Sequence, residues 1–124
     1  MNLQHPLARV KGHGASGDGS HHWWLQRLTA LALIPLSIWF MFSIVCHLGD
    51  DYSAMLQWVS TPYVAVLLVL YFAFMFFHAQ LGLQVVIEDY IHHEGWRLGI
   101  LLLSKAVMLV SGVAAVFAVL SVAL

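Results

Sequence analysis

Long apolar runs alternate with short polar segments along the chain. Three runs, at 28–48, 62–87 and 98–123, contain between them a single charged side chain, Lys105. Each run exceeds the about 20 residues that an α-helix needs to cross about 30 Å of hydrocarbon. A helix also satisfies its own backbone hydrogen bonds inside lipid. The pattern therefore predicts an all-α membrane protein with three transmembrane helices.

The polar segments define the rest of the organisation. Residues 1–22 are polar and rich in glycine, which predicts a flexible segment before a single membrane domain at 23–124. Polar connections at 49–61 and 88–97 join the three helices. Pro35 is expected to bend the first helix, which neighbouring helices tolerate in a membrane.

Composition supports a membrane protein and excludes several other classes. Hydrophobic residues make up 61% of the 124 positions and charged residues only 9%, which is more apolar surface than a soluble domain of this size can bury. The chain has no basic patch for binding nucleic acid. The single Cys46 leaves no disulfide framework and no thiolate metal cluster. The first apolar run starts too late and is too long for a cleavable signal peptide.

The five basic residues predict the orientation of the helices in the membrane. Arg9, Lys11 and Arg27 precede or open the first helix, whereas Arg97 and Lys105 lie at the start of the third. The first connection and the C-terminal tail contain no lysine or arginine. The positive-inside rule then puts the N-terminus and the second connection in the cytoplasm, and the C-terminus on the periplasmic side. Lys105 is expected to extend back to the cytoplasmic interface.

His78 is the most unusual residue of the second helix. It precedes Glu88 by ten residues, or about 15 Å of helix, and so lies about half-way through the hydrocarbon. An ionisable residue at that depth is a functional candidate. Two interpretations are open: a neutral histidine that hydrogen-bonds to a neighbouring helix, and a ligand of a metal or haem. Gly82, one turn further along, leaves room for a flat cofactor, while His47 lies too far from the midplane to be a second ligand.

The second helix ends in two acids and a tyrosine. Carboxylates at a helix C-terminus are disfavoured by about 0.3–1 kcal/mol each, so stability alone does not explain Glu88 and Asp89. Glu88 is explained by ordinary solubility of the connection. Asp89 lies eleven residues after His78 and therefore shares a helix face with it and with Gly82. Tyr90 is either an interfacial aromatic residue or, together with Asp89, part of a site that binds a quinone carbonyl and exchanges its protons.

Three further polar residues lie in or beside the first two apolar runs: Arg27, Gln80 and Gln84. Arg27 opens the first helix, where it fits both an interfacial anchor and a cation facing haem propionates. Gln80 and Gln84 lie on a different face from His78 and are expected to form hydrogen bonds between helices. Three helices have little interior in which to bury such residues, which favours a subunit whose faces are completed by another membrane chain.

A short motif in the second helix resembles a known family. His78-Ala-Gln-Leu-Gly82-Leu-Gln-Val-Val-Ile-Glu88-Asp89-Tyr90 has the spacing H-x3-G-x6-D-Y, and Arg27 lies in the preceding helix. This pattern resembles the small hydrophobic anchor subunit, the D-type, of succinate dehydrogenase, which is respiratory complex II. The specificity of the resemblance lies almost wholly in these thirteen residues.

The resemblance implies a set of cofactors and partners. A second three-helix cytochrome b anchor subunit would share a haem b with this chain, which supplies His78 as one axial ligand, Arg27 near the propionates and Gly82 against the ring. A flavoprotein and an iron–sulfur subunit would dock on the cytoplasmic side, with ubiquinone bound beside Tyr90 and Asp89. The chain would then take part in electron transfer from succinate to quinone, without being an enzyme by itself.

The same resemblance implies a location, and rival functions remain. The expected location is a bacterial inner membrane or the mitochondrial inner membrane. One rival is an anchor that has lost its haem and is purely structural. A second is a small transporter, which would require charged or broken helices around a midplane site.

Overall fold

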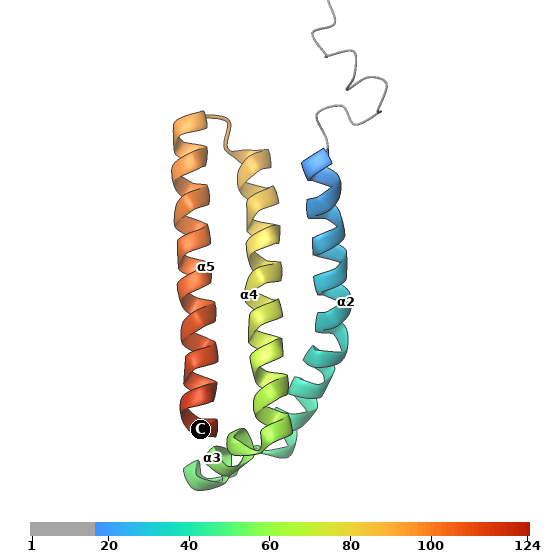
Figure 1. Ribbon diagram of the computed structural model, residues 1–124, viewed down its shortest axis with the longest axis vertical. Helices are drawn as coiled ribbons and strands as arrows, with labels where there is room; N and C mark the ends of the chain where they lie inside the picture. Colours follow the sequence, from blue (N-terminus) through green and yellow to red (C-terminus); the bar gives the residue numbers. More distant parts are fainter. Residues whose placement is uncertain (1–16) are drawn as a thin grey trace, which may run out of the picture.

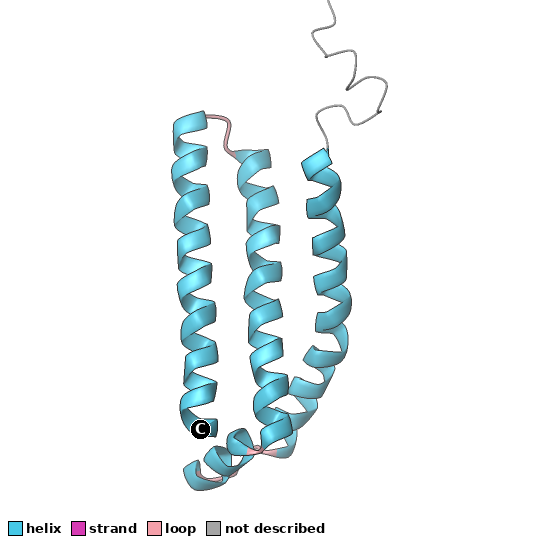
Figure 2. Cartoon of the chain, viewed as in Figure 1, coloured by secondary structure: helices cyan, strands magenta, loops and turns pink. Residues whose placement is uncertain are grey.

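The computed structural model describes residues 17–124, and this part of the chain is helical, with short turns between the helices (Figures 1 and 2). Three of the helices are long and apolar enough to cross a membrane. The prediction of an all-α protein with three spanning helices is therefore confirmed. The elements in chain order are α2 (Gly17–Cys46), α3 (Tyr52–Ser60), α4 (Pro62–Tyr90) and α5 (Glu94–Ala123).

Each long helix extends past its apolar run at one end, although α2 ends at Cys46, two residues before the predicted end of the first helix. α2 begins at Gly17 rather than at residue 28, so the end of the segment expected to be flexible is helical; residues 1–16 lie outside the described part. α4 continues to Tyr90, and α5 already begins at Glu94. Once a helix exists, each added residue gains a hydrogen bond at little cost, so a helix continues past the edge of its apolar run.

The first connection contains a helix, α3, that the hydrophobic pattern did not predict. Its N-cap is Asp51, whose carboxylate accepts hydrogen bonds from the Ala54 amide at 2.8 Å and the Ser53 hydroxyl at 2.9 Å. These bonds keep the pKa of the Asp51 carboxyl below its usual value; the Ala54 amide has the largest effect. α3 ends at Ser60, and its C-cap Thr61 is extended because Pro62, which starts α4, disfavours a helical conformation at the residue before it.

α2 is bent in the half that leads to α3. Figure 1 shows an upright upper half, in blue, and a lower half that curves towards the lower end of α4. Pro35 lies inside this helix. Proline lacks an amide hydrogen and clashes with the preceding turn, so it bends a helix at that point. The expected bend is present.

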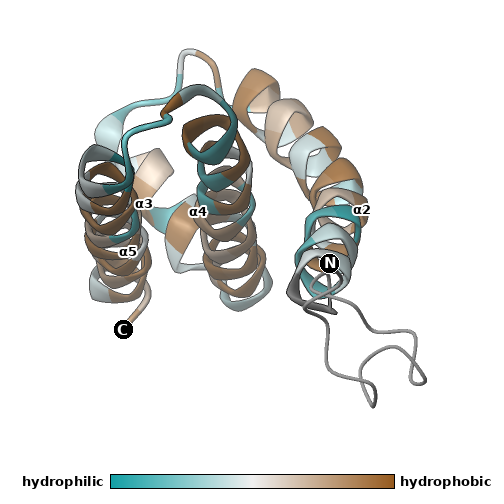
Figure 3. Cartoon of the chain, turned by 90° about the horizontal axis from the view of Figure 1, so that it is seen from above, coloured by the Kyte–Doolittle hydropathy of each residue, from teal (hydrophilic) through white to brown (hydrophobic). Residues whose placement is uncertain are grey.

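The three long helices stand in a row with α4 in the middle. α4 contacts α2 on one side and α5 on the other, while α2 and α5 do not touch each other over the described residues (Figures 1 and 3). α3 lies across one end, against α4 and α5. A row of three helices encloses little interior. Large apolar side chains therefore stay exposed, such as Phe42 at 71% and Phe117 at 70%. Lipid or another membrane chain is needed to cover them.

The best-packed region lies at the α3 end of the molecule. Val64, Ala65 and Leu68 of α4 are buried against Val119 of α5. Aromatic rings extend this cluster: Trp39–Trp58 at 6.4 Å and Phe40–Tyr71 at 4.8 Å between ring centroids. The half of α4 nearer its C-terminus is less enclosed, and this half carries the candidate site.

Candidate functional site

His78 lies within one turn of the midpoint of α4 and faces α2. Its ring nitrogen Nδ1 is 2.8 Å from the hydroxyl oxygen of Thr29, a hydrogen-bonding distance. Thr29 is only 4% exposed and is the one buried polar side chain in the described part of the chain. A hydrogen bond from the histidine to a neighbouring helix, one of the two interpretations of His78, is therefore present. It occupies one ring nitrogen and leaves the other, Nε2, without a hydrogen-bond partner among residues 17–124.

Gly82 lies one turn after His78 and also faces α2. A methyl group added at Gly82 would lie 3.6 Å from the amide nitrogen of Gln26, which is an ordinary contact. Gln26 thus covers the glycine in this chain, and its amide oxygen is buried without a partner among the described residues. The ring nitrogen Nε2 of His22, one turn before Gln26, is also buried and unpartnered there. Beside Gly82, the α2–α4 contact therefore holds a buried polar atom, the amide oxygen of Gln26, that the described part of the chain does not satisfy.

Arg27 lies at the same end of α2 but does not touch His78. Its guanidinium carbon is 5.0 Å from the centroid of the Trp23 ring, a cation–π contact, and the side chain is exposed. It precedes Thr29 by two residues, or about 3 Å along the axis, towards the start of the helix. Arg27 is therefore free to meet an anionic group that lies outside this chain.

Asp89 and Tyr90 are the last two residues of α4, and both are exposed, Tyr90 by 79%. Neither side chain forms a hydrogen bond within residues 17–124. Eleven residues, or about 16 Å of helix, separate Asp89 from His78. The structure brings His78 and Gly82 together against α2 and leaves the Asp-Tyr pair apart, at the end where α2 and α5 begin (Figure 1).

The acid before this pair has a partner in its own helix. Glu88 accepts a hydrogen bond from the amide of Gln84 at 3.0 Å, four residues earlier. Gln84 was expected to form a hydrogen bond to another helix. Within residues 17–124 it bonds instead to Glu88 of its own helix, α4. The partner bond explains how α4 tolerates one of its two terminal carboxylates, and it leaves Asp89 as the acid without a local role.

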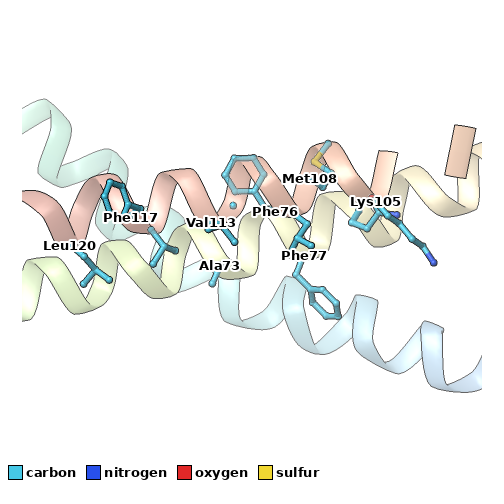
Figure 4. A pocket seen from close by; sticks show the side chains of 12 residues that line it. Ala73, Phe76, Phe77, Lys105, Met108, Val113, Phe117 and Leu120 are labelled. Carbon is cyan, nitrogen blue, oxygen red and sulfur yellow. The ribbon is translucent and has the colours of Figure 1, made fainter. Parts of the chain in front are cut away.

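A mainly apolar groove lies on the other side of α4, between α4 and α5, and it contains two polar residues, Gln80 and Lys105. The groove encloses about 670 Å³, with Lys105 at one end and Leu120 at the other (Figure 4). Phe76, Phe77 and Met108 supply much of its apolar wall. Gln80 also lines it, and both of its amide atoms are buried without a partner among residues 17–124. The hydrogen bonds expected from Gln80 to another helix are not made within the described chain.

The other histidines that the structure describes do not gather around His78. His47 bonds to the carbonyl of Ser43 at 2.8 Å and lies against Trp58, at the α3 end of the molecule. His93 caps the start of α5 by accepting from the Trp96 amide at 3.3 Å. Among the described residues, no three His, Cys, Asp or Glu side chains gather into a metal cluster. His78 is the one histidine within the membrane centre, so this part of the chain offers an iron at that depth a single imidazole.

Thr29 and Gln26 are the two site residues that the sequence did not single out. Both are polar residues in the first helix, in the segment Gln26-Arg27-Leu28-Thr29. Their spacing of three residues puts them on one face, and this spacing was the available signal. It could not be used without knowing which face of α2 meets His78.

The comparisons with known proteins identify the family. The profile of the family described as "Succinate dehydrogenase/Fumarate reductase transmembrane subunit" matches residues 1–120, which include α2 to α4 and most of α5. The chain belongs to this family. The resemblance seen in the H-x3-G-x6-D-Y motif is therefore confirmed over nearly the whole sequence. Together with the succinate dehydrogenase anchor subunits that match the chain, this family identifies it as a membrane anchor subunit of succinate dehydrogenase, and the three long apolar helices indicate a multi-pass membrane protein.

Individual relatives in this family agree with the assignment. The succinate dehydrogenase hydrophobic membrane anchor subunit of Rickettsia conorii is 32% identical over 113 residues, which cover 90% of each chain. The succinate dehydrogenase membrane anchor subunit of Porphyra purpurea is 31% identical over 102 residues, or 82% of each chain. The hydrophobic membrane anchor subunit of Paracoccus denitrificans is 26% identical over 85 residues. No solved structure gives a significant match.

Proposed function

We propose that this anchor subunit supplies one axial ligand to a haem b and one wall of a ubiquinone site in a succinate:quinone oxidoreductase. The observation that carries the proposal is the state of His78. The ring lies near the midpoint of α4, one nitrogen is held by Thr29, and Nε2 has no partner among the described residues. Histidines that bind a metal usually have this arrangement: one ring nitrogen binds the metal and the other is hydrogen-bonded to a neighbouring group.

The donor set around His78 fits a haem better than a metal ion alone. An imidazole nitrogen suits iron, and a haem needs only one or two axial ligands because the porphyrin supplies the other four. Gly82 and the unsatisfied amide of Gln26 lie one turn from His78. A bound haem supplies a one-electron redox centre. His78 would hold the iron through Nε2, and the exposed guanidinium of Arg27 would pair with an anionic propionate.

The open row of helices supports a second anchor subunit as partner. His78 is the one described histidine near the midpoint of a long apolar helix, so a second histidine ligand would come from another chain. A second three-helix cytochrome b subunit would cover the apolar faces that α2, α4 and α5 leave exposed. A flavoprotein and an iron–sulfur subunit would dock at the end of α4 that carries Tyr90, because electrons from succinate must reach the quinone there.

Asp89 and Tyr90 supply the groups that a quinone requires. The Tyr90 phenol is neutral at pH 7 and donates a hydrogen bond to a quinone carbonyl. The Asp89 carboxylate accepts a proton or orients a water molecule, and it delivers protons from the cytoplasmic side. Exposure of both side chains in the isolated chain is expected for residues that complete their site against another subunit. The membrane is the bacterial inner membrane or the mitochondrial inner membrane.

The experiment that tests this function is purification of the complex through a tag on this chain. The expected product contains a flavin-bearing subunit, an iron–sulfur subunit, a second membrane chain and the optical spectrum of a low-spin haem b. A complex with all four subunits and no haem absorption would support the rival interpretation, a structural anchor without haem. Isolation of the chain without a flavin-bearing subunit would contradict the proposed function as a whole.

A further inference from the structure

We infer that Thr29 is a positioning residue for the haem ligand: its hydroxyl selects the ring tautomer of His78 and directs Nε2 towards the iron. The inference rests on the proposed role of His78. It assigns to α2, through a residue outside the H-x3-G-x6-D-Y motif, a part in tuning the haem. The observations behind it are three distances around one hydroxyl oxygen.

The hydrogen-bond donors and acceptors around Thr29 determine where each proton lies. The Thr29 hydroxyl oxygen is 2.7 Å from the backbone carbonyl of Leu25 and 3.1 Å from that of Gln26. A carbonyl can only accept, so the single hydroxyl proton of Thr29 points to the shorter of these contacts, Leu25. The same oxygen is then an acceptor towards His78, 2.8 Å away. His78 must therefore donate through Nδ1–H.

The tautomer determines which nitrogen can bind iron. In a neutral imidazole, one nitrogen carries the proton and the other carries the lone pair. Because Nδ1 is protonated and bonded to Thr29, the lone pair is on Nε2. The two ring nitrogens point in nearly opposite directions, so Nε2 points away from Thr29. The hydrogen bond thus fixes both the tautomer and the orientation of the ring.

Thr29 is well suited to hold a ring in a fixed position. It is 4% exposed, and a β-branched side chain in a helix has few rotamers. Its bond to the carbonyl four residues earlier selects the rotamer in which the oxygen faces α4. An acceptor on Nδ1–H also raises the basicity of the opposite nitrogen. A more basic ligand stabilises ferric iron relative to ferrous iron, so loss of the acceptor should raise the midpoint potential of the haem.

The test uses the assembled complex and three substitutions. Thr29→Val keeps the shape and removes the hydroxyl, whereas Thr29→Ser keeps the hydroxyl. Ser104→Ala is the matched control, because among residues 17–124 the Ser104 hydroxyl bonds only to the Leu101 carbonyl of its own helix. The measurements are the redox titration of the haem and the electron paramagnetic resonance spectrum of the ferric low-spin form, which reports ligand orientation and basicity.

The expected result is a raised potential in Thr29→Val, with wild-type values in Thr29→Ser and Ser104→Ala. Outer-shell partners typically contribute about 10- to 100-fold to metal affinity. A tenfold loss confined to the ferric form corresponds to a rise of about 59 mV for one electron. If Thr29→Val lacks haem altogether, retention of haem in Thr29→Ser supports the inference, and loss of haem in both overturns it.

A His78→Ala complex distinguishes a failure of the proposed haem ligand from a failure of the role assigned to Thr29. If that complex retains its haem, the proposed ligand is wrong and the role of Thr29 fails with it. If it loses the haem while Thr29→Val keeps the wild-type potential and resonance spectrum, the proposed function stands and only the role of Thr29 is overturned.

Discussion

Gly82→Ala separates the packing of this chain from the binding of its proposed cofactor. The added methyl group has one neighbour within 4 Å in the described structure, the Gln26 amide nitrogen at 3.6 Å. That distance is an ordinary van der Waals contact, so the methyl group fits without movement of the backbone. Alanine also has a higher intrinsic helix propensity than glycine, by about 0.8–1.0 kcal/mol. The helix itself should therefore form as well as in the wild type.

A haem edge beside Gly82 changes this expectation. An extra methyl group in a closely packed site typically costs about 1–3 kcal/mol, which corresponds to roughly 5- to 150-fold in affinity. We expect Gly82→Ala complexes to assemble with their full flavin content and a lowered ratio of haem to flavin. Gly82→Leu should lower the ratio further, because its longer side chain occupies more of the same space.

The assay is the ratio of haem to flavin in the purified complex. The matched control is Gly99→Ala in α5, since nothing lies within 4 Å of a methyl group added there and no role is assigned to it. Gly99→Ala should keep the wild-type ratio. A wild-type haem content in both Gly82→Ala and Gly82→Leu would show that the cofactor does not lie against this glycine.

Three other predictions concern the ends of the helices. Tyr90→Phe removes one hydrogen bond, worth about 0.5–1.5 kcal/mol, and should weaken quinone binding roughly 2- to 13-fold; Asp89→Asn should also impair quinone reduction. Neither change should affect succinate oxidation by an artificial acceptor, and wild-type quinone kinetics in both would place the site elsewhere. A reporter fused after Leu124 should be periplasmic and one near Gly95 cytoplasmic, whereas the opposite pattern would reverse the proposed orientation. The pKa of Asp51 is lower in the folded protein than in the unfolded chain. Its ionised carboxylate therefore stabilises α3 at pH values above the unfolded pKa, and this stabilisation is lost as pH falls through the folded pKa. Hydrogen exchange of the α3 amides, corrected for intrinsic rates, should therefore accelerate in acid in the wild type but not in Asp51→Asn; equal pH dependence would contradict this role of the cap.

The hydrophobic pattern was sufficient to predict the membrane-spanning helices but not their ends. Apolar side chains report which residues lie in hydrocarbon, and α2 and α5 both begin in polar sequence before it. The same limitation hid α3, because the helix starts at a cap, Asp51, and not at an apolar run. In each case the helix is stabilised by local hydrogen bonds, which a hydropathy pattern does not record.

The candidate site was predictable where it lies on one helix and unpredictable where it depends on two. Spacing alone put His78 near the middle of the second helix and Gly82 on the same face, and both residues face α2 in the structure. The hydrogen bond from His78 to Thr29 joins residues 49 positions apart. Such a pair depends on the rotation of α2 against α4, which is set by packing and not by the pattern of either helix. Gln84 shows the reverse case, since a partner four residues away in its own helix replaced the expected partner on another.

The most direct test of the central claim is the haem content of the complex when His78 is replaced by alanine. His47→Ala is the matched control, because His47 also has one Nδ1 hydrogen bond, but it lies in the turn just after α2, at the α3 end of the molecule. If His78 binds the haem iron, His78→Ala should lose or strongly weaken the low-spin haem b spectrum, while His47→Ala retains it at the wild-type ratio to flavin. An unchanged haem spectrum in the His78→Ala complex would contradict the account.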